Sequence, residues 1–430
     1  MKKAALHNLG CKVNAYETEA MQQMLEAAGY EIVPFNEPAD VYVVNTCSVT
    51  NMADRKSRQM LHKAKKNNPD SIVVATGCYV QTSEKEALED LSIDIVIGNN
   101  RKHELVSLIE EFAKDNVLDI NHEKQEFEEL FVSQTAEHTR AFIKVQDGCN
   151  QFCSYCIIPY ARGRVRSRKL ENVIDEVMRL ASNGYKEVVL TGIHLSSYGV
   201  DFEDKTDLLA LIQAVNRVDG IERIRLGSLE PKIVTEEFAS ALSQMPKVCP
   251  HFHLSLQSGC DATLKRMNRR YTAEEYETGC QLLRKYFKHP AITTDVIVGF
   301  PGESDEEFEI TKQFLKKIHF YEMHIFKYSK RKGTRAAAMQ DQVAEQIKTG
   351  RSAELISLGN EMSDEFRMYY TGKIKDVLFE EKVEINGKSY YTGYTKEYVK
   401  VAKESEETLE NQIIEGKITG RLTDDIYIMR

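Results

Sequence analysis

The strongest constraint on the fold is an alternation of short apolar runs with segments of helical periodicity, which occurs twice along the chain. In the first series the apolar runs cover 4–9, 41–46, 71–77 and 93–98, and each is followed by a helical pattern. Strands that recur between helices indicate βαβ units and a parallel sheet. We therefore predict that residues 1–120 form an α/β domain with a parallel sheet.

The second series predicts a partial barrel over residues 140–335. Its apolar runs cover 141–146, 187–192, 221–228, 251–257, 291–300 and 322–329. Eight βα units close a full barrel, so six suggest a barrel that stays open on one side. The polar, unpatterned stretch 121–139 between the two series is predicted to be a linker.

The pattern changes again in the C-terminal part of the chain. Residues 336–370 have helical periodicity, and we expect them to pack back on the barrel as a helical connection. From 371 to 430 apolar and polar residues alternate, and "NGK" at 386–388 is typical of a turn. This pattern indicates a small antiparallel β-barrel. The predicted fold class is α/β, in three parts.

Composition bounds the cellular setting. No apolar run approaches the ~18 residues that a membrane span needs, and the start lacks a signal-peptide core, so we expect a cytoplasmic protein without a membrane partner. Nine cysteines, an odd number, fit metal-binding or catalytic thiols in a reducing compartment better than a disulfide framework. The net charge of −9 argues against a wholesale nucleic-acid coat, although local basic clusters can still bind a phosphate backbone.

Cys149, Cys153 and Cys156 have C-x3-C-x2-C spacing in "QDGCNQFCSYC", directly after the first strand of the second series. A zinc knuckle is one interpretation, but zinc sites usually combine such a pair with a second, distant pair, and no second pair lies nearby. Three thiolates can instead hold a [4Fe–4S] cluster with one open iron, which can bind a substrate or cofactor.

This motif, in a loop after the first strand of a βα series, resembles the radical S-adenosylmethionine (SAM) superfamily. The resemblance implies that the amino and carboxylate groups of SAM occupy the open iron. It also implies SAM contacts at later strand ends: Thr191 and Gly192 at the amino group, Ser255 and Gln257 at the ribose, and Gly299 at the adenine. Each of these segments is weak alone, because a glycine after a strand is more often a simple turn.

Three more cysteines, Cys11, Cys47 and Cys78, each follow a predicted strand of the first series. The carboxyl ends of parallel strands meet at one crevice, so the three thiols can meet in space. Buried free cysteines are the alternative, since free cysteine packs well in cores. We predict an auxiliary [4Fe–4S] cluster at this position. The cysteines that show no ligand spacing are Cys249, Cys260 and Cys280.

A three-cysteine α/β domain, a radical SAM barrel and a C-terminal β-barrel, in this order, resemble the methylthiotransferases. Within that family "LGCKVNAYETEAM", "QDGCNQFCSYCIIPYARGRVRSR" and "TGIHLSSYG" are most similar to the bacterial tRNA branch that acts on N6-threonylcarbamoyladenosine beside the anticodon. The resemblance implies that the C-terminal barrel is an RNA-binding TRAM domain. It implies the tRNA anticodon stem-loop as a partner, with a flavodoxin or ferredoxin as electron donor.

The implied reaction replaces the hydrogen at adenine C2 with a methylthio group. Because C2 is an unactivated aromatic carbon, this replacement requires a radical. The resemblance implies that the cluster on Cys149, Cys153 and Cys156 gives one electron to SAM and releases a 5′-deoxyadenosyl radical. The auxiliary cluster carries the sulfur, which a second SAM molecule methylates. The implied cofactors are two [4Fe–4S] clusters and SAM, while the protein supplies orientation and excludes water and oxygen.

Two basic runs are candidates for contact with RNA phosphates. "ARGRVRSRK" and "KYSKRKGTR" lie at the predicted rim of one active site. A charge run is usually a solvated face, but two runs at one rim favour phosphate contact. The C-terminal "TGYTKEYVKVAK" mixes Tyr and Lys, which suits base stacking and backbone contact. The candidate residues are Arg162, Arg164, Arg166, Arg168, Lys169, Lys327, Lys330, Arg331, Lys332 and Arg335.

Three other functions remain open at the level of sequence. A related branch methylthiolates an aspartate of a ribosomal protein, and a second tRNA branch acts on isopentenyladenosine. A non-catalytic iron–sulfur RNA-binding protein is the alternative from another class. The basic runs and the C-terminal barrel do not separate these functions, and motif similarity favours the threonylcarbamoyladenosine branch.

Overall fold

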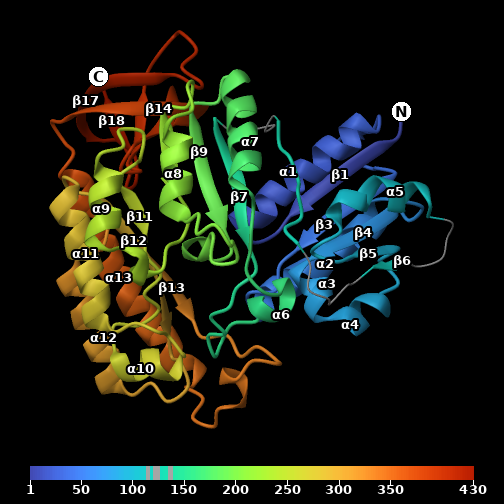
Figure 1. Ribbon diagram of the computed structural model, residues 1–430, viewed down its shortest axis with the longest axis horizontal. Helices are drawn as coiled ribbons and strands as arrows, with labels where there is room; N and C mark the ends of the chain where they lie inside the picture. The colour runs from blue at the N-terminus through green and yellow to red at the C-terminus, as the bar shows by residue number, and fades with distance from the viewer. Residues whose placement is uncertain (113–116, 120–125, 134–138) are drawn as a thin grey trace.

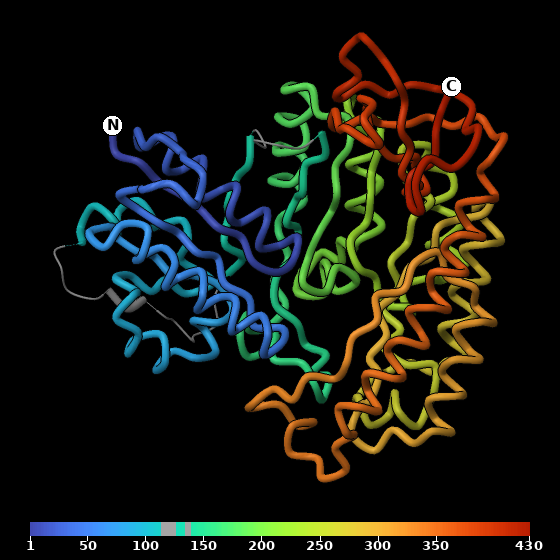
Figure 2. The backbone as a smooth tube through the Cα atoms, turned by 180° about the vertical axis from the view of Figure 1, so that it is seen from behind, coloured from blue at the N-terminus to red at the C-terminus, as the bar shows by residue number. Residues whose placement is uncertain are grey.

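The computed structural model describes residues 1–112, 117–119, 126–133 and 139–430. The N-terminal α/β region lies beside a central barrel, and a small C-terminal β-barrel sits at one end of that barrel (Figures 1 and 2). Of the predicted linker 121–139, residues 121–125 and 134–138 lie outside the described residues. Among the described residues, no helix is long and apolar enough to cross a membrane.

The N-terminal region is built on one parallel sheet with strand order β2-β1-β3-β4-β5-β6, in agreement with the predicted α/β fold. Its strands are β1 (Lys3–Asn8), β2 (Glu31–Ile32), β3 (Val41–Thr46), β4 (Ile72–Gly77), β5 (Ile95–Ile97) and β6 (Val117–Asp119). The sequence does not predict β2 and β6, because two or three residues are too few to show a period. The helices are α1 (Lys12–Ala27), α2 (Asn51–Asn67), α3 (Cys78–Thr82), α4 (Glu84–Leu88) and α5 (Leu105–Glu110).

Helices cover both faces of this sheet (Figure 1). On one face, Met21 of α1 and Leu105 of α5 share a core with Val43 of β3. On the other face, Leu61 of α2 packs in a second core with Val44, the next residue of the same strand. Both faces of β3 are therefore buried, which leaves the carboxyl edge of the sheet as the place for polar groups and ligands.

The central region is a six-stranded parallel barrel that is open on one side, as the sequence predicts. Its strands are β7 (Arg140–Asp147), β9 (Glu187–Gly192), β10 (Arg223–Leu226), β11 (His251–His253), β12 (Ala291–Val298) and β13 (Glu322–Lys327). They form two sheets that isolated bridges connect, for example between Leu229 and Leu254. A short antiparallel strand, β8 (Arg166–Ser167), pairs with the end of β7.

Helices cover the outer face of the barrel (Figure 1). The helices of this region are α7 (Leu170–Ser182), α8 (Leu208–Asn216), α9 (Glu236–Ser243), α10 (Asp261–Arg266), α11 (Ala273–Tyr286), α12 (Asp305–Ile318) and α13 (Glu345–Met368). A further short helix, α6 (Ile158–Arg162), lies beyond the end of β7 and contacts α3 of the N-terminal region. Reciprocal capping boxes start α11 at Thr272 and α12 at Ser304, which the T-x-x-E and S-x-x-E patterns explain. Helix α13 packs against β13. Phe252 and Leu254 are buried in the outer core, whereas His253 between them is half-buried, so alternate residues face the lumen.

The C-terminal region is a closed five-stranded barrel with order β14-β15-β16-β18-β17. Its strands are β14 (Ile374–Ile385), β15 (Lys388–Thr395), β16 (Lys400–Lys403), β17 (Ile413–Arg421) and β18 (Tyr427–Met429). Four of its pairings are antiparallel as predicted, whereas β16 and β18 pair in parallel. The parallel pair closes the barrel and removes the exposed edges.

Buried arginines attach the C-terminal barrel to the central one. Arg223 donates to the carbonyl oxygens of Tyr394 at 2.8 Å and Asp376 at 2.9 Å. Arg225 donates to Thr395 O at 2.9 Å and is also paired with Glu187 at 2.7 Å. Because these guanidinium groups would lose their acceptors without the C-terminal barrel, the two barrels form one structural unit.

The described part of the predicted linker is fixed between the first two regions. Leu130 and Val132 pack in one cluster with Tyr16 of α1. The Tyr16 hydroxyl donates to Leu130 O, and Val132 N donates to Glu176 of α7 at 2.9 Å. Residues 126–133 therefore hold α1 and α7 together.

Candidate active site

The first cysteine site lies on the loop between β7 and α6, at the carboxyl end of the first barrel strand. Gly148 begins this loop with a φ of +70°, and a Cβ atom there would lie 1.8 Å from the carbonyl oxygen of Arg164. Only glycine fits such a close approach in the left-handed region. The glycine of "DGC" thus lets the loop fold back so that Cys149, Cys153 and Cys156 line one cavity.

The segment after α10 holds this loop in place. Ser154 N donates to Met267 O at 2.9 Å, and Asn268 Nδ2 donates to Phe152 O at 2.9 Å. Arg269 Nη1 donates to Cys153 Sγ at 3.2 Å. The loop is therefore positioned by hydrogen bonds. None of the nine cysteines forms a disulfide bond.

The three thiols line a cavity of about 140 Å³ at the carboxyl ends of the barrel strands. Ser255 and Gln257, two of the predicted SAM contacts, line the same cavity. Gln257 adopts a φ of 72°, an uncommon conformation for a residue with a side chain, which is typical of functional sites. The other polar lining residues are Gln151, Tyr155, His194, Ser228, Glu230 and Arg269. The free side of the thiol triad thus faces polar and charged groups.

The cavity contains groups of both charges. Glu230 Oε2 lies 3.1 Å from His194 Nε2 and accepts a hydrogen bond of 3.2 Å from Gln151 Nε2. Burial alone would raise the pKa of Glu230, but the hydrogen bond from His194 and the nearby charges of His194 and Arg269 lower it on balance. A carboxylate and a guanidinium in one cavity suit a zwitterionic amino-acid group, which is the part of SAM that binds an open iron.

The structure places the remaining predicted SAM contacts outside the lining of this cavity. Thr191 is buried at the end of β9. Gly192 packs against Gln146, and a Cβ atom at position 192 would lie 2.9 Å from the Cβ atom of Gln146. The amide of Gly299 donates to Glu303 at 2.9 Å. The contacts at these three positions therefore stay predictions, and in the β9 segment Ile193 and His194 are the residues that line the cavity.

Sequence reasoning missed three charged residues of the cavity: His194, Glu230 and Arg269. His194 and Glu230 follow the strands β9 and β10, so their strand-end position was an available signal. Arg269 stands in "MNRRYT", which has the composition of a surface turn. Nothing local in the sequence shows that its guanidinium is directed at Cys153.

The arrangement of the thiols fits an iron–sulfur cluster better than a single zinc ion. Zinc with bonds of about 2.3 Å holds its sulfur ligands roughly 3.8 Å apart. Among the described residues, neither cysteine triad forms a group with all its ligand atoms within 4.8 Å of one another. Burial raises the pKa of Cys149 to about 11 and that of Cys156 to about 12, so iron must displace their protons.

The second cysteine site lies at the carboxyl edge of the N-terminal sheet. Cys11 precedes α1, Cys47 follows β3, and Cys78 begins α3. Gly10 and Gly77 have φ of +106° and +97°, and a Cβ atom at Gly10 would lie 2.8 Å from Cys47 Sγ. Burial raises the pKa of Cys47 to about 11, and the neighbouring Cys78 and Cys11 add to this rise. The structure thus brings together the three predicted ligands of the auxiliary cluster.

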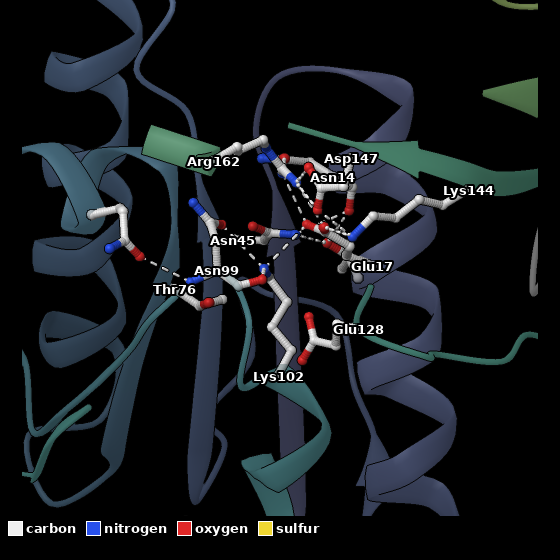
Figure 3. A network of polar contacts seen from close by, with 12 residues as sticks. Asn14, Glu17, Asn45, Thr76, Asn99, Lys102, Glu128, Lys144, Asp147 and Arg162 are labelled. Carbon is white, nitrogen blue, oxygen red and sulfur yellow. Dashed lines mark hydrogen bonds and ion pairs between the residues drawn. The ribbon is translucent and has the colours of Figure 1, made fainter. Parts of the chain in front are cut away.

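A network of buried charged side chains joins α1 to β7 and α6 (Figure 3). Arg162 of α6 donates to Glu17 of α1 through bonds of 2.9 and 3.0 Å and contacts Asp147 at 3.2 Å. Lys144 lies 2.8 Å from both carboxylates, and Lys102 lies 3.4 Å from Glu17. Burial would raise the pKa of Glu17, but Arg162, Lys102 and Lys144 hold it far below its ordinary value. The network locks α1 against the radical SAM loop.

Figure 3 shows Arg162 and Asn14 in this network, and both interact with auxiliary cysteines: Asn14 Oδ1 lies 3.8 Å from Cys11 Sγ, and Arg162 acts on Cys78. Arg162 Nη2 donates to Asn14 Oδ1 at 2.6 Å, and Asn14 Nδ2 donates to Leu9 O at 2.7 Å and Thr46 O at 3.1 Å. Burial raises the pKa of Cys78, and the charge of Arg162 offsets part of that rise. Within the described part of the chain, Arg162 Nε has no hydrogen-bond partner. This buried donor beside Cys78 fits an acceptor such as a cluster sulfur.

A second cavity, of about 250 Å³, lies next to the first and shares part of its wall. Tyr155, Gln257 and Asp295 line this second cavity. Of these, Tyr155 and Gln257 also line the cavity of the radical SAM cysteines. Val49 and Thr50, which follow Cys47 closely in the chain, form another part of its wall. The cavity therefore extends from the radical SAM site toward the loop that carries Cys47.

Four of the predicted RNA contacts are corrected by the structure. Arg162, Arg166, Arg168 and Arg331 are buried, at 1, 8, 0 and 6 % exposure. Each has carboxylate partners: Arg166 lies 3.4 Å from Asp147, Arg168 pairs with Glu176 and Glu129, and Arg331 lies 2.5 Å from Asp54. A buried, paired guanidinium does not reach an RNA phosphate. These arginines instead fix loops around the site.

The other members of the two basic runs are exposed. Arg164 stands over the ring of Phe152 at 4.5 Å, on the radical SAM loop. Lys330 lies beside Asn51 of the N-terminal region, whose side chain donates to Lys330 O at 3.0 Å. The exposed basic residues are Arg164, Lys169, Lys327, Lys330, Lys332 and Arg335. They remain candidates for phosphate contact.

Two protein families match this chain. Residues 143–315 match the radical SAM superfamily, and residues 3–98 match the Uncharacterized protein family UPF0004. The first range contains most of the barrel, with Cys149, Cys153 and Cys156, and ends before β13. The second range contains Cys11, Cys47 and Cys78.

Similar proteins cover nearly the whole chain. The Threonylcarbamoyladenosine tRNA methylthiotransferase MtaB of Bacillus subtilis (strain 168) is 42% identical over 423 residues, which are 97% of this chain and 94% of that protein. The protein of the same name from Aquifex aeolicus (strain VF5) is 41% identical over 93% of this chain and 98% of its own length. The tRNA-2-methylthio-N(6)-dimethylallyladenosine synthase of Clostridium botulinum (strain Okra / Type B1) is 38% identical over 86% of this chain and 84% of its own.

Solved structures show a related fold. The radical S-adenosylmethionine methyltransferase TsrM from Kitasatospora setae superposes with a TM-score of 0.56 and 16% identity, over 76% of this chain and 73% of its own. At this identity the likeness concerns the fold alone.

Proposed function

Because the chain belongs to the radical SAM methylthiotransferase family, we propose that it adds a methylthio group to C2 of N6-threonylcarbamoyladenosine beside the anticodon of tRNA. The substrate follows the MtaB relatives, which match 93–97% of the chain at 41–42% identity. The proposed cofactors are two [4Fe–4S] clusters and SAM, used as two equivalents.

The observation that carries this proposal is a pair of adjacent cavities, which lead from the radical SAM cysteines toward the loop after Cys47. Tyr155 and Gln257 line both the cavity of the radical SAM cysteines and the cavity that reaches Val49 and Thr50 behind Cys47. A methylthio transfer needs both a radical source and a sulfur source around one carbon atom. The two adjacent cavities supply such a space, whereas a non-catalytic RNA-binding protein has no need of it.

The residues of the chain hold and orient the reactants. When bound, the clusters and SAM supply the electron, the radical and the sulfur. Arg269 and Glu230 offer charged partners to the carboxylate and amino groups of SAM, and Ser255 and Gln257 offer hydrogen bonds to its ribose. Tyr155, in the wall shared by both cavities, separates the reactants from bulk water.

The substrate base must leave its stack to enter this space, which anticodon-loop bases can do. Exposed Arg164, Lys330 and Lys332 lie on the loops beside the cavities and suit the RNA backbone. The C-terminal barrel is proposed as a further RNA-binding surface, a small reducing protein such as a flavodoxin or ferredoxin as electron donor, and the cytoplasm as the location.

The second candidate substrate is isopentenyladenosine in tRNA, because the Clostridium botulinum relative carries the dimethylallyladenosine name at 38% identity. The two substrates differ in the N6 substituent, which bears a carboxylate in one and is a hydrocarbon in the other. Nucleosides of tRNA from a strain that lacks the gene, analysed by mass spectrometry, test the proposal. Loss of the 2-methylthio form of threonylcarbamoyladenosine is expected, and loss of the isopentenyl product instead would contradict it.

A further inference from the structure

Three potential metal ligands meet inside the barrel, away from both cysteine triads. His253 ends β11, and Asp295 of β12 and His324 of β13 stand on the neighbouring strands. One ligand atom from each lies within 4.8 Å of the others, and His253 Nε2 is 3.3 Å from Asp295 Oδ2. His253 and Asp295 are half-buried, and His324 is exposed. Among the described residues, these three are the His, Cys, Asp or Glu side chains whose ligand atoms lie close enough together to hold one metal ion.

The orientation of His253 is fixed by a neighbour that suits a metal ligand. Its Nδ1 atom lies 3.0 Å from the hydroxyl oxygen of Thr293, which is buried on the same strand as Asp295. A histidine that binds a metal through Nε2 commonly hydrogen-bonds through Nδ1 to a fixed partner, which sets its tautomer and ring angle. His253 and His324 stand on the two strands that flank β12, and their rings stack with centroids 5.8 Å apart.

The surroundings favour a cation. Glu322, also on β13, interacts electrostatically with both His324 and His253. Two imidazoles and one carboxylate form the ligand set of zinc and non-haem iron sites, where three protein ligands leave a position open.

The site is accessible from two directions. Asp295 lines the 250 Å³ cavity that Tyr155, Gln257, Val49 and Thr50 also line. His324 lines a separate cavity of about 580 Å³ together with Glu322, Asp364 and Asp424. Arg367 and Arg421 also line the second cavity and pair with Asp364 and Asp424, so these two carboxylates are already partnered there. The first cavity offers space for a further ligand.

We propose that His253, Asp295 and His324 bind one divalent transition-metal ion, with zinc as the best-suited ion, and leave its open position toward the cavity that Asp295 lines. The open position accepts an oxygen donor, such as a carboxylate or carbonyl group of a bound molecule. The site is distinct from the cysteine triads and does not depend on the identity of the RNA substrate.

Zinc binding by the enzyme with both cysteine sites loaded with iron tests this proposal. Zn²⁺ is added anaerobically, weakly held metal is removed with a chelating resin, and zinc and iron per chain are measured by mass spectrometry. The wild type is expected to retain about one zinc per chain, and His324→Ala and Asp295→Asn are expected to lose it at unchanged iron content. His62→Ala is the matched control, because His62 pairs with Asp90 at 2.9 Å outside this group.

Two further measurements keep the proposal open to refutation. Thr293→Val keeps all three ligands and is expected to weaken zinc affinity by about 10-fold to 100-fold, because it removes the partner of Nδ1. In crystals soaked with Zn²⁺, an anomalous difference peak is expected about 2.0–2.2 Å from the His253 and His324 nitrogens. Equal zinc retention by the wild type and His324→Ala, or a zinc peak at the cysteines alone, would overturn the assignment.

Discussion

Arg162 and Glu17 form a fully buried ion pair with two hydrogen bonds, of 2.9 and 3.0 Å. Arg162 ends α6, six residues along the chain from Cys156, and Glu17 lies on α1, which Cys11 precedes. The pair thus joins α6, which follows the loop of Cys149, Cys153 and Cys156, to α1, which follows Cys11. The relative position of the two cysteine sites depends on this contact.

Replacing Arg162 with Gln is expected to be strongly destabilising. Glu17 and Asp147 would remain buried with less positive charge, and breaking a buried pair from one side typically costs about 3–5 kcal/mol. The double variant Arg162→Gln with Glu17→Gln is expected to recover part of this loss, because it leaves no unpaired partner at position 17. Urea unfolding of the two variants and the wild type measures the difference. Equal stability of Arg162→Gln and the wild type would contradict this role.

The same network predicts sensitivity to acid. The folded-state pKa of Glu17 and that of Asp147 lie below their ordinary values, because the cations around them outweigh the effect of burial. Their stabilising contribution is therefore complete above the unfolded pKa values of about 4 and is lost as the pH falls below them. Each carboxylate contributes up to about 1.4 kcal/mol per pH unit in that range.

Urea unfolding of the apoprotein between pH 6 and pH 3 measures how the free energy of unfolding changes with pH. This range spans the unfolded pKa values of about 4. A Glu17→Gln variant is expected to be less stable at pH 6 but to lose stability less steeply on acidification. Identical slopes for the variant and the wild type would show that Glu17 does not carry the effect.

The two cysteine sites are expected to be separable. Replacing Cys149, Cys153 and Cys156 with Ala should remove about half of the iron and abolish reductive cleavage of SAM, since we propose one cubane cluster for each site. Replacing Cys11, Cys47 and Cys78 should remove the other half and leave some cleavage. Iron analysis and an anaerobic assay for 5′-deoxyadenosine check both outcomes. Replacing Cys249, Cys260 and Cys280, which line neither site, is the control.

Contact with tRNA is expected at the exposed basic residues. A triple variant with Ala at Arg164, Lys330 and Lys332 should bind tRNA more weakly and with a shallower dependence on salt, by about one unit of log–log slope for each phosphate that the variant no longer neutralises. Lys66→Ala, at the opposite end of α2 from Asn51, is the control for a general charge effect. An Arg331→Ala variant differs in kind, because Arg331 is buried against Asp54 and its removal acts through folding.

Much of the fold follows from local sequence patterns. Helices cover both faces of the N-terminal sheet, so its longer strands need apolar residues on both faces and appear in the sequence as continuous apolar runs. In β3, for example, every residue is buried. The cysteines follow strand ends, and the geometry of a parallel sheet converts that position into proximity. Ser255 and Gln257 lie in the cavity for the same reason.

The corrected residues depend on partners that are distant in sequence. "RGRVRSR" has the composition of an exposed basic run, yet Arg162 is paired with Glu17 and Arg168 with Glu176. Glu17 stands 145 residues away from Arg162, and no period or spacing in the run indicates this partner. For the same reason the sequence does not identify Arg269 as a neighbour of Cys153. Side-chain burial inside a functional loop is set by tertiary contacts, which a local pattern does not contain.

The most direct test of the proposed activity is a comparison of two RNA substrates. The reconstituted enzyme is given SAM, a reductant and tRNA that carries either N6-threonylcarbamoyladenosine or isopentenyladenosine, and the digested nucleosides are analysed by mass spectrometry. A site suited to a polar substituent leaves buried polar groups unpaired when a hydrocarbon binds, at about 1–3 kcal/mol each, so preference for the first substrate of roughly tenfold or more is expected. A 2-methylthio product formed preferentially on the isopentenyl tRNA, or on neither RNA, would contradict the account.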